Sequence, residues 1–203
     1  MKGPLLLFLD CDGVLNTTRC LTCEYSDDDS SLVFPSRAEL DDFFPLERSC
    51  LERLRRIIQE TGAHIVLTTT WRTLPAMRSY LLEAMEKSGI ETAAVLGDTP
   101  TLAGAGRGQE ISCFLEQARL IYGGEEHAVL PTFAILEDDD KHLASFAREG
   151  LAGRCVKTET EHGLTEAAAD EVICLLAGDR RIPSVNSPVA SSPQVAGDKI
   201  ARQ

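Results

Sequence analysis

Two aspartates separated by one residue, Asp10 and Asp12, are the part of the sequence whose types and spacing point most directly to chemistry. They follow an unbroken apolar run, Leu5–Leu9, and Gly13 comes directly after them. Two carboxylates this close repel each other unless a cation or a phosphoryl group is placed between them. The glycine permits a sharp turn or a close approach of the backbone to a ligand. The pattern indicates metal or phosphoryl chemistry, with a calcium loop or a polar loop without chemistry as alternatives.

A second acidic group follows the apolar run 132–136. It consists of Glu137, Asp138, Asp139 and Asp140. Four consecutive acids beyond a buried strand repel one another, and a divalent cation relieves that repulsion. Mg²⁺ prefers oxygen ligands and commonly keeps several waters besides one or two carboxylates. The group therefore predicts a magnesium site, while Asp139 and Asp140 also suit the first turn of a following helix.

Hydroxyl and guanidinium groups complete the set of candidate residues. The apolar run 64–67 continues into Thr68 and Thr69, and a threonine hydroxyl can donate a hydrogen bond to a phosphate oxygen. Threonines at the end of a strand are also ordinary β-branched residues. Arg107 lies in a glycine-rich segment and Arg72 follows the threonines. Either arginine could neutralise phosphate charge, with an ordinary surface role as the alternative for both. We favour Arg107 because its loop is glycine-rich and free to turn inward.

The elements that must position these residues alternate along the chain. Apolar runs predict strands at 5–9, 64–68, 93–96, 132–136 and 154–157. Segments with helical spacing and helix end signals predict helices at 45–61, 75–87, 110–122, 141–148 and 165–177. This alternation implies βαβ units, so we expect an α/β fold, a Rossmann-like three-layer sandwich with a mostly parallel central sheet. Such sheets bind ligands beyond the carboxyl ends of their strands, where the candidate residues fall.

The domain organisation follows from where the pattern breaks. We expect one domain over residues 1–178, with a short cap-like insertion at 17–44 that is too small for a large cap domain. Residues 179–203 are rich in Pro, Ser, Val and Ala without periodicity, and we expect a disordered tail.

The heptad Asp10–Asn16, read as Asp-Cys-Asp-Gly-Val-Leu-Asn after an apolar strand, resembles the first motif of the haloacid dehalogenase-like (HAD) superfamily. Its commonest members are magnesium-dependent phosphatases. Residues 66–68 resemble the second motif, Arg107 the third, and Glu137 with Asp138 the fourth. The likeness is closest to the small HAD domains associated with RNA-repair proteins, through Asp12–Asn16, Thr68–Arg72 and Gly163–Thr165.

The resemblance implies a catalytic role for the first two aspartates. Asp10 would attack phosphorus and form an aspartyl-phosphate, and Asp12 would serve as general acid and then general base. An acid at both positions favours a phosphatase over a dehalogenase, which lacks the second one.

The resemblance also implies a set of binding residues. The phosphate would be held by Thr68, or by Thr69 as second choice, together with Arg107. Mg²⁺ would be bound by Asp10, Asp138 and the backbone carbonyl of Asp12. Glu137 would either bind the ion directly or contact the residues that bind it.

Charge and cysteine content limit the expected partners. A net charge of −12 disfavours unspecific binding to nucleic acid or anionic membranes. We therefore expect a small phosphorylated metabolite or nucleotide as substrate, with a nucleic-acid end or a non-catalytic phosphate-binding scaffold as alternatives. No apolar run reaches the roughly 18 residues of a membrane span. Seven scattered cysteines favour a reducing, intracellular and so cytoplasmic setting, and Cys20 with Cys23 lack the second pair of a zinc site.

Overall fold

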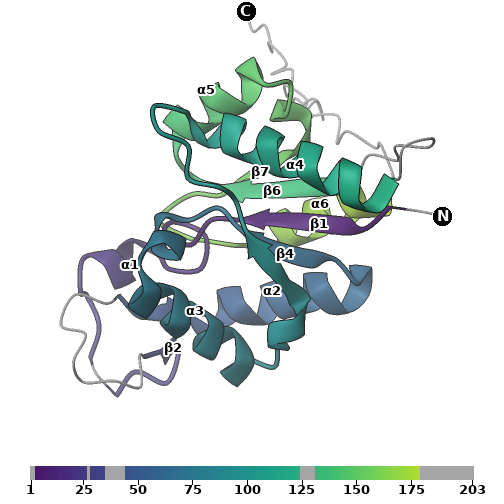
Figure 1. Ribbon diagram of the computed structural model, residues 1–203. Coiled ribbons are helices and arrows are strands. Elements are labelled where there is room, and N and C mark those ends of the chain that lie inside the picture. The colour runs from purple at the N-terminus through teal and green to yellow at the C-terminus, as the bar shows by residue number, and fades with distance from the viewer. Residues whose placement is uncertain (1–2, 27, 35–43, 124–130, 179–203) are drawn as a thin grey trace, which may run out of the picture.

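A parallel five-stranded sheet forms the centre of the molecule in the computed structural model, which describes residues 3–26, 28–34, 44–123 and 131–178 (Figure 1). The strand order is β5-β4-β1-β6-β7. The strands are β1 (Leu5–Leu9), β4 (His64–Leu67), β5 (Val95–Asp98), β6 (Thr132–Glu137) and β7 (Cys155–Lys157). Because β1 lies between β4 and β6, the residues that follow these three strands meet at one edge of the sheet.

Helices cover both faces of the sheet, which makes three layers. The helices of the described residues that follow or connect these strands are α2 (Arg48–Thr61), α3 (Pro75–Lys87), α4 (Arg107–Gly123), α5 (Asp140–Arg148) and α6 (Glu166–Ala177). In Figure 1, α4 and α5 lie above the sheet, while α2 and α3 lie below it. The expected α/β sandwich with a parallel central sheet is therefore confirmed.

The side chains of β1 alternate between two hydrophobic cores. Leu7 and Leu9 pack into the core formed with α2, α3 and α6, whereas Leu6 and Phe8 pack into the core formed with α4 and α5. All four side chains are fully buried. This explains why the run lacks polar alternation, since a strand buried on both faces has no solvent side.

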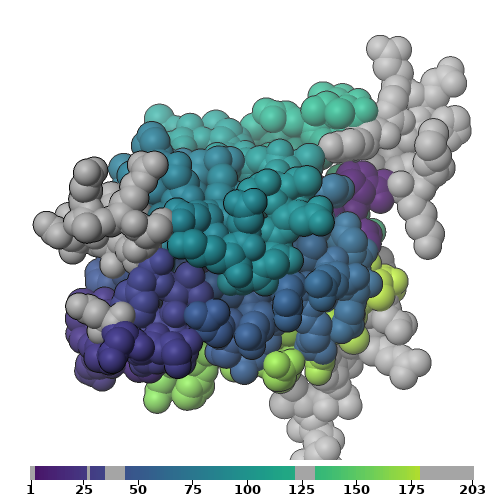
Figure 2. All heavy atoms as spheres, turned by 90° about the horizontal axis from the view of Figure 1, so that it is seen from below, coloured from purple at the N-terminus to yellow at the C-terminus, as the bar shows by residue number. Residues whose placement is uncertain are grey.

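The insertion after β1 contributes, in its described part, one strand to a second, two-stranded sheet. Its described part contains α1 (Thr18–Leu21) and β2 (Leu32–Val33), and β2 pairs antiparallel with β3 (Leu46–Glu47). In Figure 2 these purple residues form one end of the molecule and lie against the neighbouring blue residues. A buried Glu47 carboxylate accepts hydrogen bonds from Thr17 and Arg19, which ties the insertion to the base of α2.

Three expected elements differ from the structure by more than one residue at an end. The helix expected from Pro45 begins at Arg48, because Leu46 and Glu47 pair with β2. The helix expected from Glu110 begins earlier, at Arg107. The third strand is preceded by a 3₁₀ turn, η2 (Thr92–Ala94), and begins at Val95.

Some sequence-based expectations concern residues outside this description. The tail 179–203 and part of the insertion, residues 27 and 35–43, lie there. Among the residues that are described, we find no helix with the length and apolar character needed to cross a membrane.

Candidate active site

The first two candidate residues lie in a tight turn at the end of β1. The carbonyl of Cys11 accepts hydrogen bonds from the N–H groups of Val14 and Leu15. Gly13 has a φ of +69°, and a Cβ at this position would come within 2.0 Å of Oδ2 of Asp138. The turn therefore requires glycine both for its backbone conformation and for the close approach of Asp138.

A polar cavity of about 440 Å³ lies above this turn. It is lined by Asp10, Asp12, Thr70, Arg107, Asp138, Asp139, His142 and Thr160. The lining comes from the residues after β1, β4, β6 and β7 and from the start of α4. The parallel sheet has thus brought the carboxyl ends of its strands together, as expected for a ligand site in an open α/β sheet.

Arg107 connects two of the acids in this cavity. One of its nitrogens, Nη1, lies 2.7 Å from Oδ2 of Asp10 and 2.8 Å from Oε2 of Glu137. Arg107 is only 7% exposed. Burial raises the pKa of Asp10 to about 7, with the positive charge of Arg107 acting in the opposite direction.

Arg72, the alternative phosphate-binding arginine, is occupied elsewhere. Its guanidinium donates to the backbone carbonyls of Thr68, Thr69 and Thr99, and it pairs with Glu110 at 2.7 Å. These contacts hold the segment after β4 against the start of α4. The structure therefore places Arg107, and not Arg72, beside Asp10.

Glu137 directs both of its carboxylate oxygens at donors within the protein. Oε1 accepts hydrogen bonds from the N–H groups of Asp138 and Asp139, each at 3.2 Å. Oε2 faces Arg107, and Nδ1 of His142 lies 3.1 Å from it. Burial alone would raise the pKa of Glu137, but His142 and Arg107 outweigh it and lower that pKa to about 2. These contacts describe an anchoring carboxylate behind the cavity rather than one directed into it.

The carboxylate of Asp138 lies against Gly13 in the turn after β1. Its Oδ2 accepts a hydrogen bond of 2.7 Å from Oγ1 of Thr160, and burial raises its pKa. The neighbouring acids have other tasks. Asp139 accepts a hydrogen bond from the N–H of Lys141 at the start of α5, and Asp140 pairs with Lys157 on the surface.

These residues fit a magnesium ion by the chemistry of their donors. Asp10 and Asp138 offer carboxylate oxygens in one cavity, and the contact between Asp138 and Gly13 brings the second carboxylate to the Asp12–Gly13 backbone. Ligand atoms of Asp10, Glu137 and His142 also lie within 4.8 Å of one another. However, Nη1 of Arg107 already occupies the space between Asp10 and Glu137, so the donor set with Asp138 is the better candidate.

The three threonines after β4 have different environments. Thr68 is fully buried, its N–H donates to the carbonyl of Leu9, and its hydroxyl oxygen has no hydrogen-bond partner among the described residues. The hydroxyl of Thr69 accepts a hydrogen bond from the N–H of Trp71. Thr70 lines the cavity. The placement of Thr68 and Thr69 leaves their phosphate-binding role a prediction, and it adds Thr70 as a third candidate.

Sequence reasoning missed several side chains that contact the acids. Trp71 and Asn16 each donate a hydrogen bond of 3.1 Å to Asp12, Thr160 donates to Asp138, and His142 lies beside Glu137. Asn16 and Trp71 belong to the short strings that carry the family resemblance, which was the available signal. Nothing in the local sequence singles out Thr160 or His142.

The segment 158–165 supports the turn after β1 from beneath. The hydroxyl of Thr158 donates to the carbonyl of Gly13, and the N–H of Leu164 donates to the carbonyl of Val14, each at 2.8 Å. A Cβ on Gly163 would come within 2.8 Å of that same Val14 carbonyl oxygen. The late Gly-Leu-Thr string therefore has a structural reason, since it packs against the turn after β1.

The fold and the site together define an α/β protein with an acidic, arginine-containing site at the carboxyl ends of its central strands. The family described as the HAD domain in Swiss Army Knife RNA repair proteins matches residues 6–169, which is most of the chain. The chain belongs to this family, which confirms the resemblance found in the sequence. A comparison with curated proteins found no match.

Proposed function

We propose that the chain is a phosphomonoester hydrolase that works through an aspartyl-phosphate on Asp10. Membership of the HAD family implies a phosphatase-type hydrolase. The observation that carries the finer proposal is the arrangement of Asp10. It is held by Arg107 at the end of β1, in a cavity that also contains Asp12 and Asp138.

The chemistry would proceed in two displacements at phosphorus. In the first, a carboxylate oxygen of Asp10 bonds to phosphorus while the ester P–O bond breaks, and Asp12 gives its proton to the leaving oxygen. In the second, Asp12 takes a proton from water, the water oxygen bonds to phosphorus, and the bond to Asp10 breaks. Arg107 would neutralise part of the charge that Asp10 and the phosphoryl oxygens bring together.

Asp10, Asp138 and the backbone carbonyl of Asp12 would hold the metal ion. When bound, Mg²⁺ supplies charge screening between an anionic nucleophile and an anionic phosphate. Thr160 would keep the carboxylate of Asp138 in place through the 2.7 Å hydrogen bond, and Glu137 would hold Arg107 from behind.

Phosphate release tests the proposal directly. We expect purified protein to release inorganic phosphate from 4-nitrophenyl phosphate and from at least one class among phosphorylated metabolites, nucleotides and RNA ends. A protein that binds these compounds but releases no phosphate above the Asp10→Asn background would instead support the non-catalytic alternative.

Magnesium dependence provides a second prediction. Replacing Asp138 with alanine is expected to raise the Mg²⁺ concentration needed for half-maximal activity by at least about tenfold, because a direct carboxylate ligand is lost. The matched control is Asp140→Ala, which removes an acid from the same run but only breaks a surface ion pair with Lys157. Full activity of the wild type in EDTA, or equal magnesium requirements in both variants, would argue against this site.

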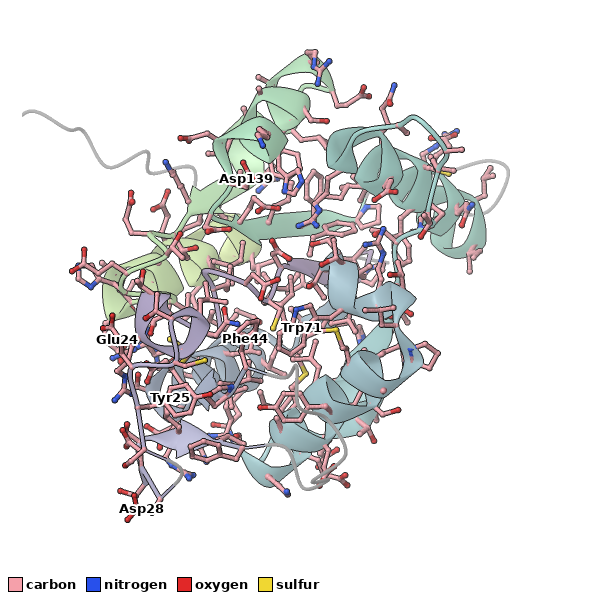
Figure 3. All side chains as sticks on the ribbon, turned by 90° about the vertical axis from the view of Figure 1, so that its left-hand side faces the viewer. Glu24, Tyr25, Asp28, Phe44, Trp71 and Asp139 are labelled. Carbon is pink, nitrogen blue, oxygen red and sulfur yellow. The ribbon has the colours of Figure 1, made fainter. Side chains whose placement is uncertain are left out.

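The third question is whether the substrate is an RNA end or a small phosphomonoester. One observation favours each of these two classes. The family description points to RNA ends. The net charge of −12 points to small substrates. The insertion adds acids such as Glu24 and Asp28, although Figure 3 shows both of them well separated from Asp139. Two of the arginines on α2 are also neutralised by α6, since Arg53 pairs with Glu166 and Arg56 with Asp170.

We therefore predict that a small phosphomonoester or terminal nucleotide is hydrolysed at least as efficiently as a long RNA end. Raising salt from about 50 to about 200 mM should change kcat/KM only several-fold, whereas six to ten phosphate contacts would cause a loss of roughly 10³-fold or more. The two substrates are compared side by side over this salt range. A steep salt dependence with strong preference for the long RNA would favour the nucleic-acid end phosphatase.

A further inference from the structure

We propose that Trp71 is a positioning residue that fixes the carboxyl group of Asp12 for proton transfer. This inference rests on the proposed function, because it concerns the general acid of that reaction. The indole Nε1 of Trp71 donates to Oδ2 of Asp12 at 3.1 Å, and Nδ2 of Asn16 donates to Oδ1 at 3.1 Å. Each oxygen of the carboxyl group thus has one donor from the protein.

The orientation of Asn16 is fixed by a third contact. Its side-chain oxygen accepts a hydrogen bond of 2.9 Å from the N–H of Gly13, so its amide nitrogen must face Asp12. An indole N–H has no acceptor lone pair, and this amide presents only its donor side. Neither partner can therefore accept a hydrogen bond from Asp12.

This arrangement determines where a proton on Asp12 can point. When Asp12 is protonated, its O–H cannot be directed at Trp71 or at Asn16, because both positions are taken by donors. Asp12 also lines the cavity. The O–H must therefore use one of the two lone-pair directions that remain, one on each oxygen, and the two donors hold the carboxyl plane so that these directions stay constant. A fixed proton is what transfer to a leaving oxygen requires.

Trp71 is itself held in place by packing. It lies in the 3₁₀ turn η1 (Thr70–Thr73) and is only 2% exposed. Its ring stacks on Tyr80 of α3, with the ring centroids 5.9 Å apart, and the hydroxyl of Tyr80 donates to the carbonyl of Val33 in β2. Figure 3 shows Trp71 in the interior of the molecule, with Tyr25 of the insertion below it and Asp139 above. The insertion thus supports the general acid through Tyr80 and Trp71.

The first test observes the contact itself and needs no turnover. The chain contains one tryptophan, so the indole N–H gives a single NMR resonance in uniformly ¹⁵N-labelled protein. We expect Asp12→Ala to move this resonance and to speed its exchange with solvent. Tyr80→Phe keeps the ring and Asp12 and is expected to leave the exchange rate much closer to that of the wild type. An indole resonance that is the same in Asp12→Ala and wild type overturns the proposal.

The second test measures proton transfer through the choice of leaving group. Nitrophenolate leaves readily without a proton, whereas an alkoxide needs one from the general acid. Trp71→Phe removes the N–H and keeps an aromatic ring, and we expect it to lower kcat by about ten- to a hundredfold on an alkyl phosphate. This is part of the ~10²–10⁴-fold that a general acid contributes. On 4-nitrophenyl phosphate the loss should be only a few-fold, with little change in KM on either substrate.

Two comparisons separate positioning from a merely structural role. If Trp71→Phe folds poorly, benzothienylalanine can replace the tryptophan instead. It changes the indole N–H to sulfur and keeps the ring size, and only one site is altered because the sequence contains a single tryptophan. In an Asp12→Asn background, removing the N–H should have no further effect on the alkyl-to-aryl ratio. Equal losses on both leaving groups, or additive effects with Asp12→Asn, contradict the proposal. A wild type without Asp10-dependent turnover contradicts the proposed function instead, while the indole resonance still decides the contact.

Discussion

Asp10→Asn is expected to lower kcat by at least about 10⁴-fold on every phosphomonoester that the wild type hydrolyses. The amide is nearly the same size as the carboxylate but is a very poor nucleophile, so the covalent step is lost while binding is largely kept. The measurement is steady-state phosphate release, with rapid acid quenching to look for hydroxylamine-labile phosphate bound to the wild-type protein. Turnover within tenfold of the wild type would remove Asp10 from its role.

The same variant has an expected effect on stability, which serves as the control for folding. Burial raises the pKa of Asp10 to about 7 from an ordinary value of 3.8. Between these values the folded protein keeps a proton that the unfolded chain has released, so the carboxyl group destabilises the fold increasingly as pH rises and fully above pH 7. Asparagine carries no such penalty. In metal-free protein, the stability of Asp10→Asn relative to wild type should therefore increase from pH 4 to pH 7.

If Asp10 is a catalytic carboxyl group whose burial destabilises the fold, its replacement by asparagine should abolish activity while stability is preserved or increased. Urea unfolding at several pH values, followed by circular dichroism, measures this difference. If Asp10→Asn is instead strongly destabilised at pH 8, its loss of turnover reports damage to the fold. The inactivity of Asp10→Asn is then no evidence that Asp10 is the nucleophile.

The parts of the structure that could be predicted from sequence are those set by local pattern. Apolar runs such as Leu5–Leu9 predicted the strands of the central sheet. The rule that ligands lie at the carboxyl ends of parallel strands predicted that Asp10, Asp12 and Asp138 lie close together, and all three line one cavity. These inferences depend on neighbouring residues in the chain and on the order of strands and helices, and a single sequence is enough to infer both.

The parts that could not be predicted depend on pairings between distant residues. Leu46 and Glu47 follow a proline and precede a helical pattern, so only the contact with β2 makes them a strand. The contact between Asp12 and Trp71 joins residues 59 positions apart, and that between Asp138 and Thr160 joins residues 22 apart. Arg72 and Arg107 differ in role because of their partners, which neither local sequence specifies.

That difference in partners leads to the second large effect. Arg107→Ala is expected to lower kcat/KM by roughly 10²–10³-fold, the usual loss when a group that stabilises developing charge is removed. It should also destabilise the fold by about 3–5 kcal/mol, because the buried carboxylates of Asp10 and Glu137 lose a shared partner. Activity on a small substrate and thermal unfolding measure the two effects.

Lysine variants at the two arginines separate chemistry from structure. At position 107 a single nitrogen, Nη1, contacts both Asp10 and Glu137, so one ammonium group can replace it, and we expect Arg107→Lys to keep kcat within about tenfold of wild type. At position 72 three different nitrogens bind separate partners: Nε the Thr99 carbonyl, Nη1 the Thr68 and Thr69 carbonyls, and Nη2 the Glu110 carboxylate. Lysine cannot reproduce that fork, so Arg72→Lys should lose stability while its residual folded fraction keeps normal turnover of the phosphate ester. The opposite result, with turnover lost at 72 and kept in Arg107→Ala, would assign the phosphate-neutralising role to Arg72.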